Sequence, residues 1–245
     1  MALYRDEAIV IRTHKLGEAD RIITLITREH GRVRAVAKGV RRTKSKFGAR
    51  LEPGSLVDIQ LYVGKTLNIV TQVESLEIFG DSIAGDYQKW TIASTLLEAS
   101  ERFTSNEGEP SLQQFLLLLG ALKALAYESH DPSLILDAYF LRSLSIAGYA
   151  PSMTICSGCE APGPHKYFSL VGGGSVCVPC KPAASATPAP ETLTLMSDLL
   201  TGNWESADVS KQKSRREASG LIAAYLQWHL ERELRSLPMV ERAGR

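Results

Sequence analysis

The sequence has little of what marks membrane, secreted or disulfide-rich proteins. Its most apolar run, from Phe115 to Leu122, has eight residues, whereas a membrane-spanning helix needs roughly 18. Residues 1–12 carry alternating charges and lack the apolar stretch of a signal peptide. Four cysteines in 245 residues would make only a sparse disulfide framework. We therefore expect a soluble protein that stays in the cytoplasm.

The sequence also lacks the motifs of catalytic sites. It contains no Walker loop, no H-E-x-x-H helix and no G-x-S-x-G elbow. Glu18 and Asp20 lie near a strand start, where carboxylates more often serve a turn than acid–base chemistry. The five histidines occur singly, at positions 14, 30, 130, 165 and 229. We therefore expect that the protein is not an enzyme.

Net charge is nearly absent, because 28 Lys and Arg residues face 27 Asp and Glu residues. The balance is a cancellation between segments. Residues 1–50 carry a net charge of +8, residues 51–109 carry −7, and the remaining 136 residues are neutral overall. Such an asymmetry indicates an interaction surface. A near-zero total therefore does not exclude nucleic-acid binding.

Residues 3–80 show the two-residue alternation of half-buried β-strands, with turns at Gly17, Gly31 and Gly64. The expected strands cover residues 7–12, 20–27, 32–38, 56–63 and 67–79. Five strands in about 75 residues predict a small closed barrel of the oligonucleotide/oligosaccharide-binding type, the OB-fold.

From Ile83 onward the apolar spacing becomes helical. We expect an amphipathic helix up to about residue 107, then one that Ser111 caps through a capping box with Gln114. Asp131-Pro132 begins a third helix, and residues 211–237 form a fourth. The expected buried stripe of the second helix is Leu112, Phe115, Leu116, Leu119 and Leu122.

Residues 152–190 differ in composition from their surroundings, with four Cys and six Pro. The pairs Cys156/Cys159 and Cys177/Cys180 are two C-x-x-C turns, and 17 residues separate them. This spacing is typical of a structural zinc site, in which a hairpin brings four thiolates to one tetrahedral ion. The alternatives are four reduced thiols or two redox-active disulfides. His165 lies near the cysteines but is expected at the surface, because four thiolates already complete the shell.

The predicted fold class is therefore α+β and multidomain. An N-terminal five-stranded OB-fold barrel covers residues 1–80, and a C-terminal helical bundle covers residues 81–151 and 191–245. A four-cysteine, zinc-ribbon-like module and a linker, residues 152–190, are inserted between the two parts of the bundle.

A basic cluster between Arg28 and Arg50 contains nine Lys and Arg residues and one acid, Glu29. A strand face beside a cationic loop suits binding of single-stranded nucleic acid. The predicted nucleic-acid-binding residues are Arg32, Arg34 and Lys38 on the strand face and Arg41, Arg42, Lys44, Lys46 and Arg50 on the loop. Phe47 is expected to stack on a base. The alternative is a solvated face whose cations pair with the acidic segment 51–109.

These motifs together resemble a known family. Leu16–Gly31, Ala35–Gly39 and Ser45–Gly54 resemble the amino-terminal domain of the RecO family of bacterial recombination mediators. The order of barrel, helical bundle, four-cysteine insert and returning helix resembles the zinc-bearing members over essentially the whole chain. In that family, basic residues that contact DNA fall where this chain has Arg32, Arg34 and Lys38, and the four cysteines match the zinc ligands.

The resemblance implies a DNA repair and recombination protein without hydrolytic activity. Such proteins bind single- and double-stranded DNA and anneal complementary strands. They act with RecR to load RecA onto DNA coated by single-strand-binding protein, whose acidic tail some members bind. Three alternatives remain open: an RNA-binding or transcription-associated protein with a zinc ribbon, a nuclease without a recognisable motif, and an adaptor for an acidic protein tail.

Overall fold

The structure is a computed structural model that describes residues 2–104, 106–230 and 233–240. The chain divides into two compact units, Met1–Tyr127 and Glu128–Arg245. Each unit is described separately. No helix in the described part of the chain is long and apolar enough to cross a membrane.

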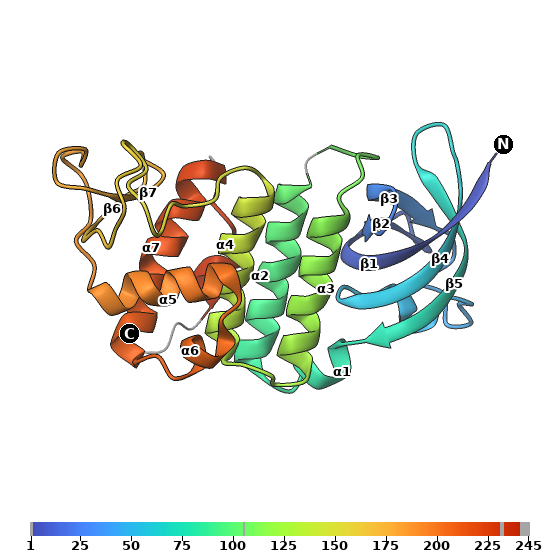
Figure 1. Cartoon of the computed structure of the whole chain (residues 1–245). Helices are drawn as coiled ribbons and strands as arrows, with labels where there is room; N and C mark the ends of the chain where they lie inside the picture. Colours follow the sequence, from blue (N-terminus) through green and yellow to red (C-terminus); the bar gives the residue numbers. More distant parts are fainter. Residues whose placement is uncertain (1, 105, 231–232, 241–245) are drawn as a thin grey trace. The chain divides into compact units, whose positions relative to one another are not determined.

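The first unit contains a closed five-stranded barrel (Figure 1). Its strands follow one another around the barrel in the order β1-β2-β3-β5-β4, as expected of an OB-fold. They are β1 (Leu3–Leu16), β2 (Asp20–Thr27), β3 (Gly31–Ala37), β4 (Ser55–Tyr62) and β5 (Asn68–Ile78). The predicted barrel is confirmed, and β1 is longer than the alternation at residues 7–12 indicated.

Residues of β3 alternate strictly between the apolar core of the barrel and its outer face. Val33, Ala35 and Ala37 are buried in the core, whereas Arg34 is exposed and Val36 half-buried on the outer face. Pairing is antiparallel along most of the barrel, but β3 and β5 run parallel and pair only at Ala35–Asn68 and Val36–Ile69. The first half of β3, which includes Arg32, is therefore not paired with β5.

Three helices complete the first unit: α1 (Gly80–Ile83), α2 (Tyr87–Phe103) and α3 (Leu112–Ala126), together with the 3₁₀ turn η1 (Gly48–Leu51). The Asp86 side chain accepts a hydrogen bond from the Lys89 amide and caps α2. The predicted capping box at the start of α3 is wrong, because the Ser111 side chain accepts no capping hydrogen bond.

The predicted buried stripe of α3 is also partly wrong. Phe115 and Leu122 are buried, but Leu112 and Leu116 are each 45% exposed. The buried face instead continues through Leu118 and Leu125. Residues 116–119 are four consecutive leucines, so the sequence offers no polar residue there that would fix the phase of the helix.

The second unit consists of helices that pack on one another and a small hairpin at their edge (Figure 1). Asp131 caps the first helix through the Ser133 amide, with Pro132 in its first turn, as predicted. The elements are α4 (Pro132–Ile146), β6 (Tyr167–Ser169), β7 (Gly174–Val176), α5 (Pro190–Thr201), α6 (Trp204–Asp208), α7 (Gln212–Leu230) and the 3₁₀ turn η2 (Leu237–Met239).

The last helix ends earlier than the apolar pattern indicates. We expected it to run to residue 237, but α7 ends at Leu230, and residues 231 and 232 lie outside the described residues. Leu234 is nevertheless buried, 3% exposed, in a segment without helical structure. Leu234 is thus buried without being part of a helix, a difference that the spacing of apolar residues alone does not reveal.

Candidate nucleic-acid interface and metal centre

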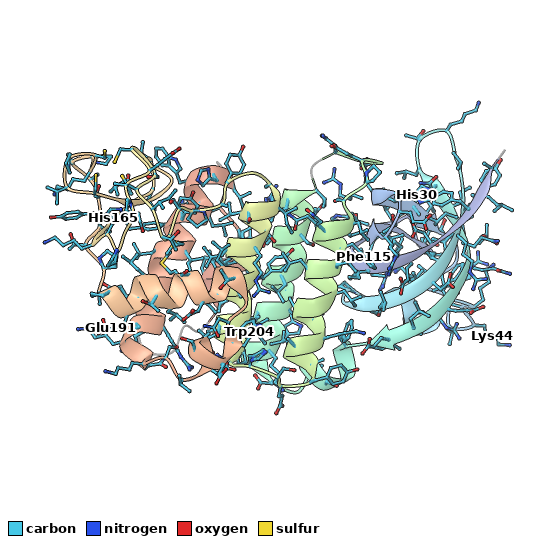
Figure 2. The ribbon with its side chains drawn as sticks, in the orientation of Figure 1. His30, Lys44, Phe115, His165, Glu191 and Trp204 are labelled. Atoms are coloured by element: carbon cyan, nitrogen blue, oxygen red, sulfur yellow. The ribbon has the colours of Figure 1, made fainter. Side chains whose placement is uncertain are left out.

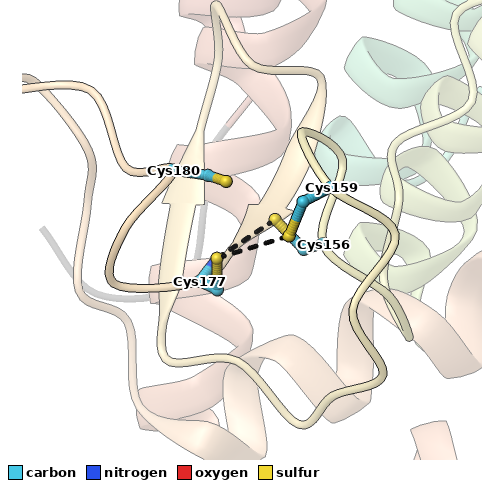
Figure 3. Close-up of side chains that lie close together, drawn as sticks. All are labelled: Cys156, Cys159, Cys177 and Cys180. Atoms are coloured by element: carbon cyan, nitrogen blue, oxygen red, sulfur yellow. Dashed lines mark hydrogen bonds between the residues drawn. The ribbon is translucent and has the colours of Figure 1, made fainter.

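The structure brings the four cysteines together. The Sγ atoms of Cys156, Cys159, Cys177 and Cys180 all lie within 4.8 Å of one another (Figure 3). The Sγ atom of Cys177 is 3.5 Å from that of Cys156 and 3.7 Å from that of Cys159. Four thiolates about 2.3 Å from one tetrahedral metal ion lie about 3.8 Å from each other. The arrangement therefore fits a metal ion of that kind.

A short hairpin places the two cysteine pairs, as predicted from their spacing. Strands β6 and β7 pair from Tyr167–Val176 to Ser169–Gly174. Gly174 lies where the Ser152 backbone approaches, and a Cβ atom there would be 2.4 Å from the Ser152 amide nitrogen. The Ser152 carbonyl accepts a hydrogen bond from the Ser175 amide at 2.7 Å. The glycine thus lets the chain before Cys156 lie against the hairpin.

The thiols of the cluster influence each other's ionisation. The Cys177 amide donates to the Cys156 sulfur, and this hydrogen bond is the largest cause that lowers the pKa of Cys156 to about 6. Hydrogen bonding to the Cys177 and Cys159 thiols raises the pKa of Cys180 to about 12. One thiolate forms readily while the last is opposed by its neighbours. Four thiolates in this space therefore require a cation.

The alternatives for the cysteines can now be compared with the geometry. None of the four forms a disulfide, and all four face one point instead of forming two separate pairs. His165 is not part of the cluster, since its Nε2 atom lies 2.9 Å from the Ala161 carbonyl oxygen. Figure 2 shows His165 on the same module.

The cysteine module packs on the last helix through aromatic rings. Phe168 is 1% exposed and meets the edge of Tyr225 with ring centroids 5.7 Å apart. The Tyr225 hydroxyl donates to the Tyr149 carbonyl oxygen at 3.3 Å. His229 stacks on Tyr149, and burial lowers its pKa. These contacts give His229 a packing role, and they join the module to helix α7 within the second unit.

On the barrel, the predicted nucleic-acid-binding residues fall into two groups. Arg32 and Arg34 lie on strand β3, whereas Lys38, expected on the same strand, follows its end. We call residues 38–50, the first part of the segment between β3 and β4, the basic loop. All six of its cations are exposed: Lys38, Arg41, Arg42, Lys44, Lys46 and Arg50. Figure 2 shows Lys44 projecting from the barrel.

Hydrogen bonds to other parts of the barrel hold the basic loop in place and leave its charges uncompensated. Arg41 donates to the carbonyl oxygens of Gly17 and Glu18, and Lys46 donates to that of Thr71. The Gly39 amide donates to the Asp20 carboxylate at 2.7 Å. Within the described residues, none of the six cations contacts a carboxylate. The loop is therefore fixed to the barrel while it presents positive charge to solvent.

The cations of the strand have partners in the acidic segment. The Arg34 guanidinium is 3.7 Å from the Glu107 carboxylate, and Arg32 donates to the backbone carbonyl of Glu101 at 3.3 Å. Similar ion pairs join Arg5 to Asp58, Arg12 to Glu101 and Arg21 to Glu52. Pairing with segment 51–109, the alternative considered from the sequence, thus describes the strand but not the loop.

The expected role of Phe47 is wrong. Its side chain is 2% exposed and belongs to the barrel core, so it cannot stack on a base. Sequence reasoning missed the apolar surface between the cations instead. Val36 shares the outer face of β3 with Arg34, and it pairs in register with Ile22 and Ile69, all three half-buried. These three β-branched residues form a half-buried apolar surface on neighbouring strands.

Chemically, the barrel can hold a polyanion and the cysteine cluster can hold a metal ion. A fixed cationic loop beside a small apolar surface is the arrangement expected for a nucleic-acid backbone with bases alongside.

The chain is similar to known proteins along its whole length. Two family models match: Recombination protein O N terminal over residues 1–79, and Recombination protein O C terminal over residues 84–238. Similar relatives carry the name DNA repair protein RecO. Those of Thermobifida fusca and Streptomyces coelicolor are both 56% identical, and that of Streptomyces avermitilis is 55% identical. In each case the match covers 99% of this chain and 100% of the relative.

Proposed function

Because the chain belongs to the RecO family, we propose that it works in DNA repair and recombination as a mediator that binds DNA and anneals complementary strands. It does so without a covalent step or a nucleotide cofactor. Two strands repel each other, and a protein that neutralises phosphates on both lowers the barrier to their encounter. Such a protein acts on chromosomal DNA in the nucleoid.

One observation carries this proposal: the basic loop holds six exposed cations that no carboxylate in the described chain compensates. If about five phosphates are contacted, the logarithm of the affinity for single-stranded DNA falls against the logarithm of salt concentration with a slope near −3 to −4. The apolar surface of Ile22, Val36 and Ile69 contacts the bases. Because these contacts do not read base edges, binding tolerates any sequence.

By family membership we further propose that the protein acts with RecR. Together they load RecA onto DNA that single-strand-binding protein covers, and the acidic tail of that protein is a contact of this chain. The test is an annealing assay on complementary oligonucleotides precoated with single-strand-binding protein. We expect the wild type to accelerate annealing and Arg42→Glu with Lys44→Glu to lose the acceleration.

Lys166→Glu with Lys181→Glu is the control for that assay. It changes the net charge equally, in the second unit, where both lysines lie over the ring of Tyr167. Equal losses in the two variants would mean that total charge, not the basic loop, drives annealing. Preference for RNA over DNA of the same sequence would favour the RNA-binding alternative, and metal-dependent degradation of the oligonucleotide would favour a nuclease.

We also propose that Cys156, Cys159, Cys177 and Cys180 hold one structural Zn²⁺ ion. The distances between their sulfur atoms support this, and four thiolates leave no position for a substrate. The ion would act as a cross-link in a module whose only strands have three residues each. We expect one equivalent of zinc in the purified protein, measured by elemental analysis, and its loss in Cys177→Ser with Cys180→Ser. Metal-free wild type, purified without chelators, would contradict the proposal.

A further inference from the structure

The connection between α2 and α3 lies along the strand that carries Arg32 and Arg34. We call residues 106–109 the acidic connection. The Gly108 amide donates to the Arg32 carbonyl at 2.9 Å, and Glu107 forms a parallel bridge with Arg32. At Gly31 the approach is so close that a Cβ atom would lie 1.7 Å from the Glu109 carbonyl oxygen. The acidic connection therefore occupies the edge of β3 that β5 does not reach.

The acidic connection places one carboxylate, that of Glu107, beside a strand cation, and Glu109 lies two residues further along the chain. Glu107 is 3.7 Å from the Arg34 guanidinium, and Glu109 is held by the Asn106 side-chain amide at 2.6 Å. Arg32 is drawn toward the end of α2, where it donates to the Glu101 carbonyl. At 3.7 Å the Glu107 carboxylate attracts the Arg34 guanidinium electrostatically, and a phosphate near Arg34 would compete with it for the same charge.

We infer that the acidic connection is an internal competitor of nucleic acid, which withholds Arg34 while the basic loop binds, and that the end of α2 holds Arg32 beside it. This inference rests on the proposed DNA binding and deepens it by naming a regulation of the same surface. The Arg34–Glu107 pair is long, and its side chains are 43% and 45% exposed. Exposed pairs of this kind contribute little stability. The contact can therefore be released without unfolding the barrel.

A purely structural role would also explain the backbone contacts, because they cover an otherwise open strand edge. The two roles differ in what they require of the side chains. Covering the edge needs the Gly108 amide and the close approach at Gly31. Competition needs the negative charge that Glu107 places beside Arg34. Replacing the carboxylates by amides of the same shape separates the two.

The experiment compares Glu107→Gln with Glu109→Gln against Glu191→Gln with Glu205→Gln. Both variants change the net charge by the same amount, and the control residues are exposed at the starts of α5 and α6. Affinity for a fluorescent oligothymidine is measured by anisotropy across a salt series. We expect the first variant to bind about fivefold more tightly at about 0.1 M salt. Its salt slope should be steeper by about 0.7 for each arginine that gains a phosphate.

Arg34→Ala completes the test as a thermodynamic cycle. In the wild type, this substitution should change the affinity by less than about twofold, because Arg34 is withheld. In the Glu107→Gln, Glu109→Gln background it should remove at least half of the gain. An affinity no higher than that of the control variant, or an equal effect of Arg34→Ala in both backgrounds, would overturn the inference. If the wild type itself shows no salt-dependent binding, the proposed function fails instead.

Discussion

Strand β3 and the basic loop that follows it have the same chemical character in the sequence but differ in the folded chain. Arg32 and Arg34 meet a carbonyl and a carboxylate from a segment about 70 residues away. The loop cations, by contrast, contact no carboxylate in the described chain; Arg41, Lys46 and Arg50 donate to backbone carbonyls, and Lys46 also lies over the Phe47 ring. Charge counted along a sequence therefore overstates the charge that a partner can use. We expect binding of a polyanion to depend mainly on the cations that have no carboxylate partner within the described chain.

The largest expected effect comes from breaking the contact between the strand and the acidic connection. Gly31→Ala forces a Cβ atom to within 1.7 Å of the Glu109 oxygen, in a backbone with φ of +65°. Steric displacement and left-handed strain together should lower the free energy of unfolding by about 3 kcal/mol. Chemical denaturation measures this.

Gly17→Ala is the matched control, because Gly17 has a similar φ of +57° and no atom within 4 Å of its added Cβ. It should lower the free energy of unfolding by about 1 kcal/mol, the strain alone. Equal losses in the two variants would show that the acidic connection does not press on the strand.

The next effect concerns the loop. Arg42→Glu with Lys44→Glu should weaken binding of an oligothymidine on the order of 50-fold at about 0.1 M salt, because two phosphate contacts become repulsions. Lys166→Glu with Lys181→Glu, equal in charge, should change the affinity by about twofold or less. Anisotropy titrations of both variants decide the matter, and a similar loss in the control would place the binding outside the basic loop.

The smallest effect concerns the cations that already have carboxylate partners, of which Arg5 is an example. Glu74→Gln removes the weaker of the two carboxylate partners of Arg5, at 3.4 Å, and leaves Asp58 at 2.6 Å. Since both Arg5 and Glu74 are more than half exposed, thermal unfolding should shift by about 1 °C or less. A larger shift would show that surface ion pairs matter more to the barrel than its apolar core suggests.

Several features could be predicted because local residues determine them. The alternation in β3 depends on neighbouring residues, and the cysteine cluster depends on two turns whose spacing fits a hairpin. The helix start at Asp131-Pro132 is equally local. Each of these signals is a pattern within a few residues, so contacts with distant segments are not needed to predict it.

Features that depend on distant segments could not be predicted. Phe47 is surrounded by cations in the sequence, which suggests exposure, but its side chain is buried in the barrel core. The partners of Arg32 and Arg34 come from the end of α2 and beyond, which no pattern near β3 reveals. Helix α5 is a different case: it was not predicted, although the residues that mark its start and its end are both present in the sequence. Pro190 stands in its first turn and Gly202 ends it in the left-handed conformation.

The most direct test of the comparison is the salt dependence of oligothymidine binding in two neutral double variants. Each variant replaces two cations by alanine: Arg42→Ala with Lys44→Ala on the loop, and Arg32→Ala with Arg34→Ala on the strand. We predict that the loop variant flattens the slope of log affinity against log salt by about 1.4, the value for two lost phosphates on a single strand. The strand variant should leave the slope nearly unchanged. Equal flattening in both variants, or a larger effect of the strand variant, would contradict it.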